Sequence, residues 1–429
     1  MGRELSQCRR VRPSRLRRRL ALLGGTTTVA DLRVALRHLA DPQSLVQGPS
    51  IAAYEQAFAD RIGVRYASSF AAGRVGLYGI LRALGIGAGD EVLLQVPTHI
   101  VVANAIRYTG AKPIYVDINL DTYNIDLAAA AERRSERTKA IVVQHTFGVP
   151  ADLDGALELA NRHGLALIED CVHALGSTYG GRQIGSFGRA AFFSTEETKT
   201  ISTTMGGMVV TDDPELASAM RSFQERCAWP SVSLSARFLL KLVLWHGLME
   251  PRVHRFSRAT YEFVGERHPL PRPTVNEELR GVQPIRYEQR LSNGQAAVGL
   301  EQLRQLETNL RHRRRVSEAY RNHLSTLGIR TPVVPEGAEA AFVRYPVWVE
   351  DRDAVERAAA PHAVLGTWFT SVLEEALTPA HGDYEEGSCP RAEAAARHLV
   401  NLPTHPRVGD GDVDAMLVTL SGATDPKLA

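Results

Sequence analysis

Short apolar segments alternate with helix-like segments through the first half of this chain. Four such segments lie at residues 91–96, 112–117, 138–144 and 165–168, and a polar turn and a helical pattern follow each of the first three. Near-continuous apolar runs of this length are typical of strands that are buried on both faces. Strands that alternate with helices form a mostly parallel sheet between helices. The sequence therefore predicts an α/β fold built on such a sheet.

The last of these strands ends in the acidic residues Glu169 and Asp170, and a second apolar segment at 190–193 is followed by Ser194 and Lys199. Open α/β sheets bind ligands at the carboxyl ends of their strands, where Asp170 is expected to lie. A lysine on the next connection can reach the same crevice. Carboxylate and lysine together are what pyridoxal phosphate chemistry requires, because the lysine forms a Schiff base and the acid keeps the pyridine nitrogen protonated. The ordinary alternatives are that Asp170 is only a capping or turn residue and that Lys199 is only a solvated charge.

Several spaced motifs surround this pair. In chain order they are H-x-x-G-x-P-x-D at 145–152, E-D-x-x-H-A-x-G at 169–176, F-S-x-x-x-x-K at 193–199 and G-G-x-x-x-T at 206–211. Their order and content resemble the DegT/DnrJ/EryC1/StrS family, the nucleotide-sugar aminotransferases of the aspartate aminotransferase fold. The resemblance covers roughly residues 48–224 and resumes from about 286. It implies a pyridoxal-phosphate-dependent transferase of fold type I with a smaller C-terminal α+β domain.

The resemblance also implies roles for individual residues. Lys199 would carry the cofactor and then move a proton as general base and acid, and Asp170 would hold the ring nitrogen protonated. His173 stands at the family's Gln/His position, which implies a hydrogen bond to the ring hydroxyl. Ser194 matches the family's phosphate-binding serine.

A loop before the helical pattern at 75–84 offers a further cofactor contact. Gly73 and Arg74 stand where the family has its phosphate-binding Gly-Thr or Gly-Ser pair, and free N–H groups at a helix start attract anions. The guanidinium of Arg74 can pair with phosphate, although it can equally point away. His99 occupies the place of an aromatic residue that stacks on the pyridine ring, and a helix cap is its alternative role.

Three further residues are candidates for substrate or cross-subunit contacts. They are Arg290, Asn293 and His405, all in segments that match the family. The resemblance implies a homodimer with its active site at the subunit interface, in which an Asn two residues before the arginine reaches the partner's cofactor phosphate. Here that position is Glu288, whose carboxylate would repel phosphate, and Asn293 is the nearby alternative.

The function implied is transfer of an amino group, with glutamate as the expected donor, to a keto sugar that is nucleotide-linked, in a biosynthetic pathway. The alternatives are another pyridoxal enzyme of the family, such as a dehydratase or a cyclitol aminotransferase, and a non-catalytic regulator or scaffold. The family's sugar dehydratases carry histidine in place of the lysine, so Lys199 favours transamination. No G-x-G-x-x-G motif follows the early strands, which disfavours a dinucleotide-binding oxidoreductase.

Composition excludes several classes of protein. The net charge of +2 gives no reason to expect nucleic-acid binding. Four scattered cysteines lack C-x-x-C spacing, so neither a metal site nor a disulfide framework is predicted, and a cytoplasmic chain is expected.

Two segments depart from the family. Residues 3–19 hold eight arginines, and the favoured interpretation is a disordered basic tail rather than an arm that contacts anionic lipid. The apolar run at 238–245 is too short to span a membrane, so it is expected to be a helix packed on the core or a dimer interface, with a peripheral membrane surface as the alternative. These observations divide the chain into a basic arm and lead-in (1–47), a cofactor-binding large domain (48–224), a divergent insert (225–285) and a C-terminal small domain (286–429).

Overall fold

The centre of the fold is a seven-stranded sheet. The computed structural model describes residues 18–22, 25–254 and 273–424. In spatial order the strands of the sheet are β1 (Tyr66–Phe70), β10 (Gly207–Thr211), β9 (Ala190–Ser194), β6 (Ala166–Asp170), β5 (Thr138–Gln144), β2 (Glu91–Gln95) and β4 (Lys112–Val116). Only β10 runs antiparallel to its neighbours in this sheet, and the other pairs are parallel. The predicted mostly parallel sheet is confirmed.

Helices cover both faces of this sheet, and alternate residues of a strand pack against different helices. Leu94 lies in one apolar cluster with side chains of α4 (Gly73–Ala83), α5 (Ile100–Arg107) and α8 (Pro214–Arg226). Its neighbour Leu93 lies in another cluster with α6 (Leu127–Arg133) and α7 (Leu153–His163). Because both faces are buried, the strands read as continuous apolar runs rather than as alternating ones.

Capping residues set where these helices begin and end. The carboxylate of Asp152 accepts a hydrogen bond from Gly155 N at 3.0 Å and starts α7. The helix ends at Gly164, which has a φ of +63°, a conformation that glycine adopts without steric cost. The helical pattern predicted to follow the segment at 138–144 is thereby confirmed as α7.

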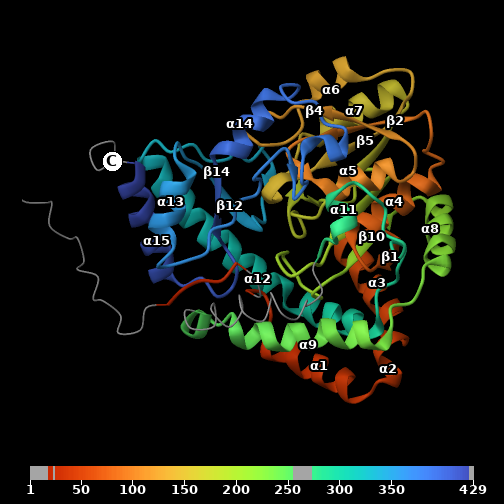
Figure 1. Cartoon of the computed structure of the whole chain (residues 1–429), viewed down its shortest axis with the longest axis horizontal. Helices are drawn as coiled ribbons and strands as arrows, with labels where there is room; N and C mark the ends of the chain where they lie inside the picture. Colours follow the sequence, from red (N-terminus) through yellow and green to blue (C-terminus); the bar gives the residue numbers. More distant parts are fainter. Residues whose placement is uncertain (1–17, 23–24, 255–272, 425–429) are drawn as a thin grey trace, which may run out of the picture.

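A second part of the fold follows the long helix α12 (Asn293–Thr326), which crosses the molecule in Figure 1. Here β12 (Arg344–Trp348) pairs antiparallel with β14 (Leu399–Pro403), beside helices α13 (Arg352–Ala359), α14 (Pro390–His398) and α15 (Asp410–Thr424). The short elements are α2 (Gln43–Val46), β3 (Thr98–His99), η1 (Thr146–Gly148), β7 (Thr178–Tyr179), β8 (Arg182–Gln183), α11 (Asn276–Leu279), β11 (Ala338–Glu339), β13 (Leu373–Glu374) and η2 (Pro379–Gly382).

The divergent insert contributes helix α9 (Val232–Leu248), which lies beside α1 (Val29–Ala40) and near α12 in Figure 1; α3 (Ser50–Ile62) also contacts α12. Leu239 and Leu242 of α9 pack against Ala35 of α1 and Val298 of α12, so the expected helix packed on the core is seen. Among the described residues no helix combines the length and apolar character needed to span a bilayer. The arginines at positions 3–17 lie outside the described residues.

Candidate active site

Asp170 ends the central strand β6, between β5 and β9. One carboxylate oxygen, Oδ1, accepts a hydrogen bond from Val172 N at 3.1 Å. The other, Oδ2, is buried and has no hydrogen-bond partner among the described residues. Burial raises the pKa of this carboxyl to about 7. A buried oxygen of this kind requires a donor, and the protonated nitrogen of a pyridine ring is a donor that fits it.

Lys199 lies on the connection between β9 and β10. Its Nζ is 4.1 Å from the centroid of the Trp368 ring. Burial lowers the pKa of this amine to about 8; Glu196 opposes that shift, while Arg344 adds to it. The amine is therefore partly neutral near physiological pH, as a nucleophile or general base must be.

A cavity of about 400 Å³ opens beside these two residues. Its lining includes five of the residues singled out from the sequence, namely Gly73, Arg74, His99, Ser194 and Lys199. Asp170 lies directly behind the cavity wall, because it pairs with Phe192 and accepts from Val172 N, and both of these residues line the cavity. The end of β6 at Asp170 and the β9–β10 connection at Lys199 thus meet at this cavity.

His173 is buried close to this cavity. Its Nδ1 accepts a hydrogen bond from Phe147 N at 3.3 Å, and its ring stacks on Trp368 at 4.3 Å. Burial and the nearby cations Lys199 and Arg344 hold its pKa well below the usual value. The ring is therefore neutral, and because Nδ1 accepts, Nε2 carries the proton and is free to donate.

The N-terminus of α4 forms one wall of the cavity. The preceding residue, Ala72, gives no side-chain cap to the helix, and a Cβ at Gly73 would lie 2.9 Å from Phe193 O. Glycine is thus required for the close approach of α4 to β9, and the helix start is open to an anion. Ser194 lies beside it, and its Oγ accepts a hydrogen bond from Glu196 N at 3.3 Å.

Arg74 and His99 are engaged with protein groups as well as facing the cavity. Arg74 forms an ion pair with the buried Glu278 and donates to Pro273 O at 2.9 Å. His99 caps α5 through a hydrogen bond from Val101 N to Nδ1, and its Nε2 lies 3.3 Å from Glu375. The cap expected as the alternative role of His99 is present, and the phosphate contact of Arg74 stays a prediction.

The three outlying candidates lie elsewhere in the chain. Arg290 places its guanidinium 4.4 Å from the Trp229 ring and donates to Cys227 O. The Asn293 amide holds Ser44 O and Ser50 N, at 2.6 and 2.8 Å. Neither residue lines the cavity of its own chain. His405 borders a small adjoining pocket with Lys199, and burial lowers its pKa to about 3.

Two residues of the cavity wall, Arg344 and Trp368, were not singled out from the sequence. The guanidinium carbon of Arg344 is 3.6 Å from the centroid of the Trp368 ring. Both come from the second half of the chain, on β12 and on the loop before β13. For Arg344 the available sequence signal was that it is the one charged residue in the otherwise apolar segment 340–349.

The insert reaches this site through a buried ion pair. Lys241 of α9 lies 3.0 Å from a carboxylate oxygen of Glu197, which also lines the cavity. Burial raises the pKa of Glu197 to about 7, with Glu196 acting in the same direction and Lys241 opposing it. The pair fixes the loop that carries Lys199 against α9, in a segment where the sequence analysis found no motif of the family.

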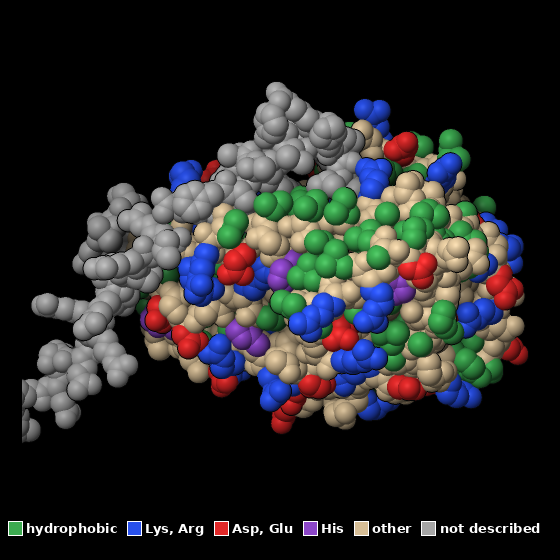
Figure 2. Space-filling model, turned by 90° about the horizontal axis from the view of Figure 1, so that it is seen from below, with side chains coloured by type: hydrophobic (Ala, Val, Ile, Leu, Met, Phe, Trp, Pro, Cys, Tyr) green, Lys and Arg blue, Asp and Glu red, His purple; other side chains and the backbone are tan. Residues whose placement is uncertain are grey.

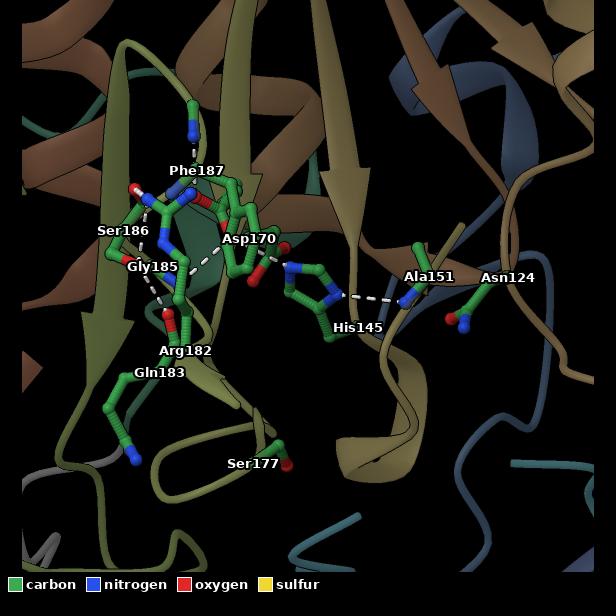
Figure 3. Close-up of polar contacts among 12 residues, drawn as sticks. Asn124, His145, Ala151, Asp170, Ser177, Arg182, Gln183, Gly185, Ser186 and Phe187 are labelled. Carbon is green, nitrogen blue, oxygen red and sulfur yellow. Dashed lines mark hydrogen bonds and ion pairs between the residues drawn. The ribbon is translucent and has the colours of Figure 1, made fainter. Parts of the chain in front are cut away.

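His145, Glu169 and Cys171 have the composition of a metal site, with ligand atoms within 4.8 Å of one another. Hydrogen bonds occupy the ligand atoms of Glu169 and His145. Glu169 accepts from the backbone N–H groups of the loop 185–188 and contacts His145 Nε2, and His145 Nδ1 accepts from Ala151 N. Figure 3 shows His145 bonded to Ala151, with Gly185 and Phe187 near the strand end that carries Asp170. Burial also raises the pKa of the Cys171 thiol, and the bonds of Glu169 hold the loop 185–188 against the end of β6.

Comparison with known proteins agrees with this geometry. Residues 27–421 match the model of the DegT/DnrJ/EryC1/StrS aminotransferase family. The chain is 32% identical over 381 residues to a GDP-perosamine synthase of Caulobacter vibrioides, covering 87% of this chain and 90% of that one.

Solved structures give the same result. The chain superimposes with a TM-score of 0.70 on DesV of S. venezuelae in complex with a ketimine intermediate, at 27% identity, covering 96% and 99% of the two chains. The fold is shared with the PLP-form of a putative sugar aminotransferase of Streptococcus pneumoniae, with a TM-score of 0.74, 18% identity and coverage of 97% and 99%. This chain therefore belongs to the DegT/DnrJ/EryC1/StrS family and is an aminotransferase whose cofactor is pyridoxal 5′-phosphate.

Proposed function

We propose that this aminotransferase moves an amino group from an amino-acid donor, glutamate first, to a nucleotide-linked keto sugar in a biosynthetic pathway. The observation that carries the reaction type is the orphaned Oδ2 of Asp170 at the end of β6, behind the same cavity that the partly neutral Lys199 lines. The substrate class is supported by the relatives, among them the GDP-perosamine synthase and a UDP-N-acetyl-3-dehydro-alpha-D-glucosamine 3-aminotransferase of Acidithiobacillus ferrooxidans, 28% identical with 89% and 91% coverage.

Asp170, His173, Ser194, Lys199 and the start of α4 each have a task in this proposal. Bound pyridoxal phosphate supplies an electron sink that stabilises negative charge at the substrate carbon. Asp170 would accept from the ring nitrogen, and Nε2–H of His173 would donate to the ring hydroxyl. The open N-terminus of α4 and the Ser194 hydroxyl would hold the phosphate. Lys199 would act as the base that removes the proton from the substrate carbon and as the acid that returns a proton.

The half-reaction with the amino donor tests this function. Purified protein mixed with glutamate alone is expected to lose its aldehyde-form absorbance and release one 2-oxoglutarate per site. A nucleotide-linked keto sugar should then restore the absorbance and appear as an amino sugar by mass spectrometry. Loss of water from the sugar without gain of nitrogen would favour the dehydratase, and no spectral change with any donor would favour a non-catalytic member.

We infer that the active form is a homodimer whose interface closes the cavity. Pro273 and Thr274 line the cavity, and the segment that continues from them exposes three large apolar side chains, Val275, Val282 and Ile285. Exposed apolar groups at the rim of a site are typical of surfaces that another chain covers. Light scattering is expected to give twice the chain mass, and Ile285→Glu is expected to lower it; a monomeric, fully active wild type would contradict the dimer.

We further propose a cytoplasmic location with peripheral contact to anionic membrane. Leu240 and Leu244 of α9 and Val29 and Leu36 of α1 are exposed, and Figure 2 shows hydrophobic side chains beside basic ones on this face. Apolar contact combined with basic side chains favours anionic lipid. Co-sedimentation with phosphatidylglycerol vesicles should exceed that with phosphatidylcholine vesicles and fall in Leu240→Ser/Leu244→Ser; equal sedimentation with both vesicle types would contradict this contact.

A further inference from the structure

The segment 196–199, which ends at Lys199, is tied to a neighbouring helix by one ion pair. The hydrogen bonds within the segment are local, such as the bond from Lys199 N to Glu196 O at 3.0 Å. Among the described residues, its side chains make one hydrogen-bonded ion pair to another element, which joins Glu197 to Lys241 of α9 at 3.0 Å. The chain that leads into Lys199 therefore depends on α9 for its position.

The segment 200–205, which follows Lys199, is held in a different way, by amide side chains of the long helix α12. These are Gln295, which donates to Met205 O, Gln302, which accepts from Ser202 N, and Asn309, which donates to Thr200 O, at 2.6, 3.4 and 2.6 Å. Lys199 thus lies between two anchors. The anchor on its C-terminal side has several bonds, whereas the anchor on its N-terminal side is the pair of Glu197 and Lys241.

This ion pair is buried on both sides. The side chains of Glu197 and Lys241 are 8% and 6% exposed, and the second carboxylate oxygen of Glu197, Oε2, has no hydrogen-bond partner among the described residues. A buried ion pair adds little net stability, because the desolvation of two charges offsets their attraction. What the pair does fix is the arrangement of the two groups, and here that is the place of the loop on the helix.

Helix α9 is well packed around the point where Lys241 leaves it. Leu239 and Leu242 lie in one apolar cluster with side chains of α1 and α12, and α9 runs beside α1 in Figure 1. One turn closer to the start of the helix, Phe238 O accepts a hydrogen bond from Thr204 Oγ1 at 3.1 Å. The ammonium group of Lys241 therefore projects from a fixed base, as a group that positions another must.

We propose that Lys241 is a positioning residue for Lys199, because it holds Glu197 and thereby the loop that directs the Lys199 amine into the cavity. The inference rests on the proposed role of Lys199 as the residue that carries the cofactor. Glu197 and Lys199 line the same cavity, and Lys241 reaches this carboxylate from α9. A displacement of about 1 Å in a reacting group costs about 10²-fold in rate, so a loosened loop has a large effect.

Lys241→Met in the full-length holoenzyme tests this role. Methionine keeps the apolar stem but cannot bond to Glu197, so kcat is expected to fall by about 10²-fold while both KM values stay within about 3-fold. Lys241→Arg keeps a charged donor and should recover most of the activity. The matched control is Arg237→Met, which removes an exposed cation from the same helix and should leave kcat unchanged.

A double variant separates the lost tether from the effect of an unpaired charge. Lys241→Met/Glu197→Gln leaves no uncompensated buried charge, so it is also the variant to use if Lys241→Met does not fold. The loss in kcat should persist in the double variant, because the loop is still not tied to α9. Recovery to the wild-type rate would show that the unpaired carboxylate caused the loss, and would overturn the positioning role.

The place of the amine can also be measured without turnover, in the cofactor-free protein. Burial lowers the pKa of Lys199 to about 8, and the charged groups that face it are Glu196, Arg344, Asp170 and Glu375. A loop released from α9 exposes the amine to water, so in Lys241→Met and in the double variant this pKa should rise by about one unit or more. Labelling with acetic anhydride over a range of pH, measured on the peptide that contains Lys199, gives the pKa.

A Lys241→Met protein that melts at a lower temperature but keeps both kcat and the Lys199 titration would overturn the inference, because the pair would then only stabilise the fold. A loss confined to KM would overturn it as well. If borohydride reduction of the wild type leaves no pyridoxyl group on Lys199, the proposed function itself fails. A wild type that carries this group, together with an unchanged titration in Lys241→Met, overturns only the role of Lys241.

Discussion

Replacing Lys199 by alanine is expected to abolish transamination, with a loss in kcat of at least about 10³-fold. The residue has two tasks, the covalent link to the cofactor and the proton transfer, and general acid–base catalysis alone contributes about 10² to 10⁴-fold. The variant should still fold, because the Nζ faces a cavity rather than a packed core. Steady-state assays with glutamate and the keto sugar measure the effect, and Lys139→Ala, which removes an exposed lysine of β5, is the control.

The pH dependence provides a second readout for Lys199. Its pKa is lowered by burial from 10.5 to about 8. Below that pH the amine is protonated and cannot accept a proton, so the rate of the lysine-dependent step should rise as pH increases through about 8 and then level off. A rate that is flat from pH 6 to 9, or a Lys199→Ala protein that still turns over glutamate, would contradict the assigned role.

Replacing Asp170 by asparagine is expected to give the second largest loss, about 10² to 10⁴-fold in kcat, while stabilising the cofactor-free protein at alkaline pH. The amide cannot balance a protonated ring nitrogen, so the cofactor loses its electron-withdrawing form. Stability changes in the opposite direction because the buried carboxylate is costly without a partner.

The sign of that change follows from the raised pKa. Burial raises the pKa of Asp170 from 3.8 to about 7, so between these values the folded chain keeps a proton that the unfolded chain has lost. Stability therefore falls as pH rises toward 7, by on the order of 4 kcal/mol for a shift of this size. An asparagine at position 170 does not ionise, so the variant does not lose this stability as pH rises.

Thermal unfolding of the cofactor-free proteins measures this difference in stability between wild type and Asp170→Asn. Asp170→Asn should melt above wild type at pH 8 and close to it at pH 4, and Asp60→Asn, an exposed carboxylate, should match wild type at both. Equal melting of wild type and Asp170→Asn at pH 8 would mean that the carboxylate already has a donor in the folded chain.

The central sheet could be predicted from the sequence because the apolar pattern that specifies each strand lies within that strand. Near-continuous apolar runs such as residues 138–144 specify a strand buried on both faces wherever it lies, and β5 has those bounds. The strand that ends at Asp170 and the loop that carries Lys199 were predictable for the same reason, since both lie within one stretch of about 30 residues.

Other features depend on tertiary contacts that sequence spacing does not contain. Glu169 and Asp170 are adjacent carboxylates with different surroundings. Glu169 accepts from backbone N–H groups of the loop 185–188, whereas Oδ2 of Asp170 has no partner among the described residues. The sequence alone does not show which of the two carboxylates this loop will bind. The partner of Arg74, Glu278, lies in the segment 225–285, where the sequence analysis found no motif of the family. Arg344 and Trp368 reach the cavity from more than 140 residues after Lys199.

The central claim is that the cofactor is held at Lys199, next to Asp170, in this one cavity. The chain has five lysines, Lys112, Lys139, Lys199, Lys241 and Lys427, so the site of attachment can be read without ambiguity. Borohydride reduction of the yellow holoenzyme followed by peptide mass spectrometry is predicted to find the pyridoxyl group on the peptide that contains Lys199. A pyridoxyl group on any other lysine, or none at all, would contradict the account.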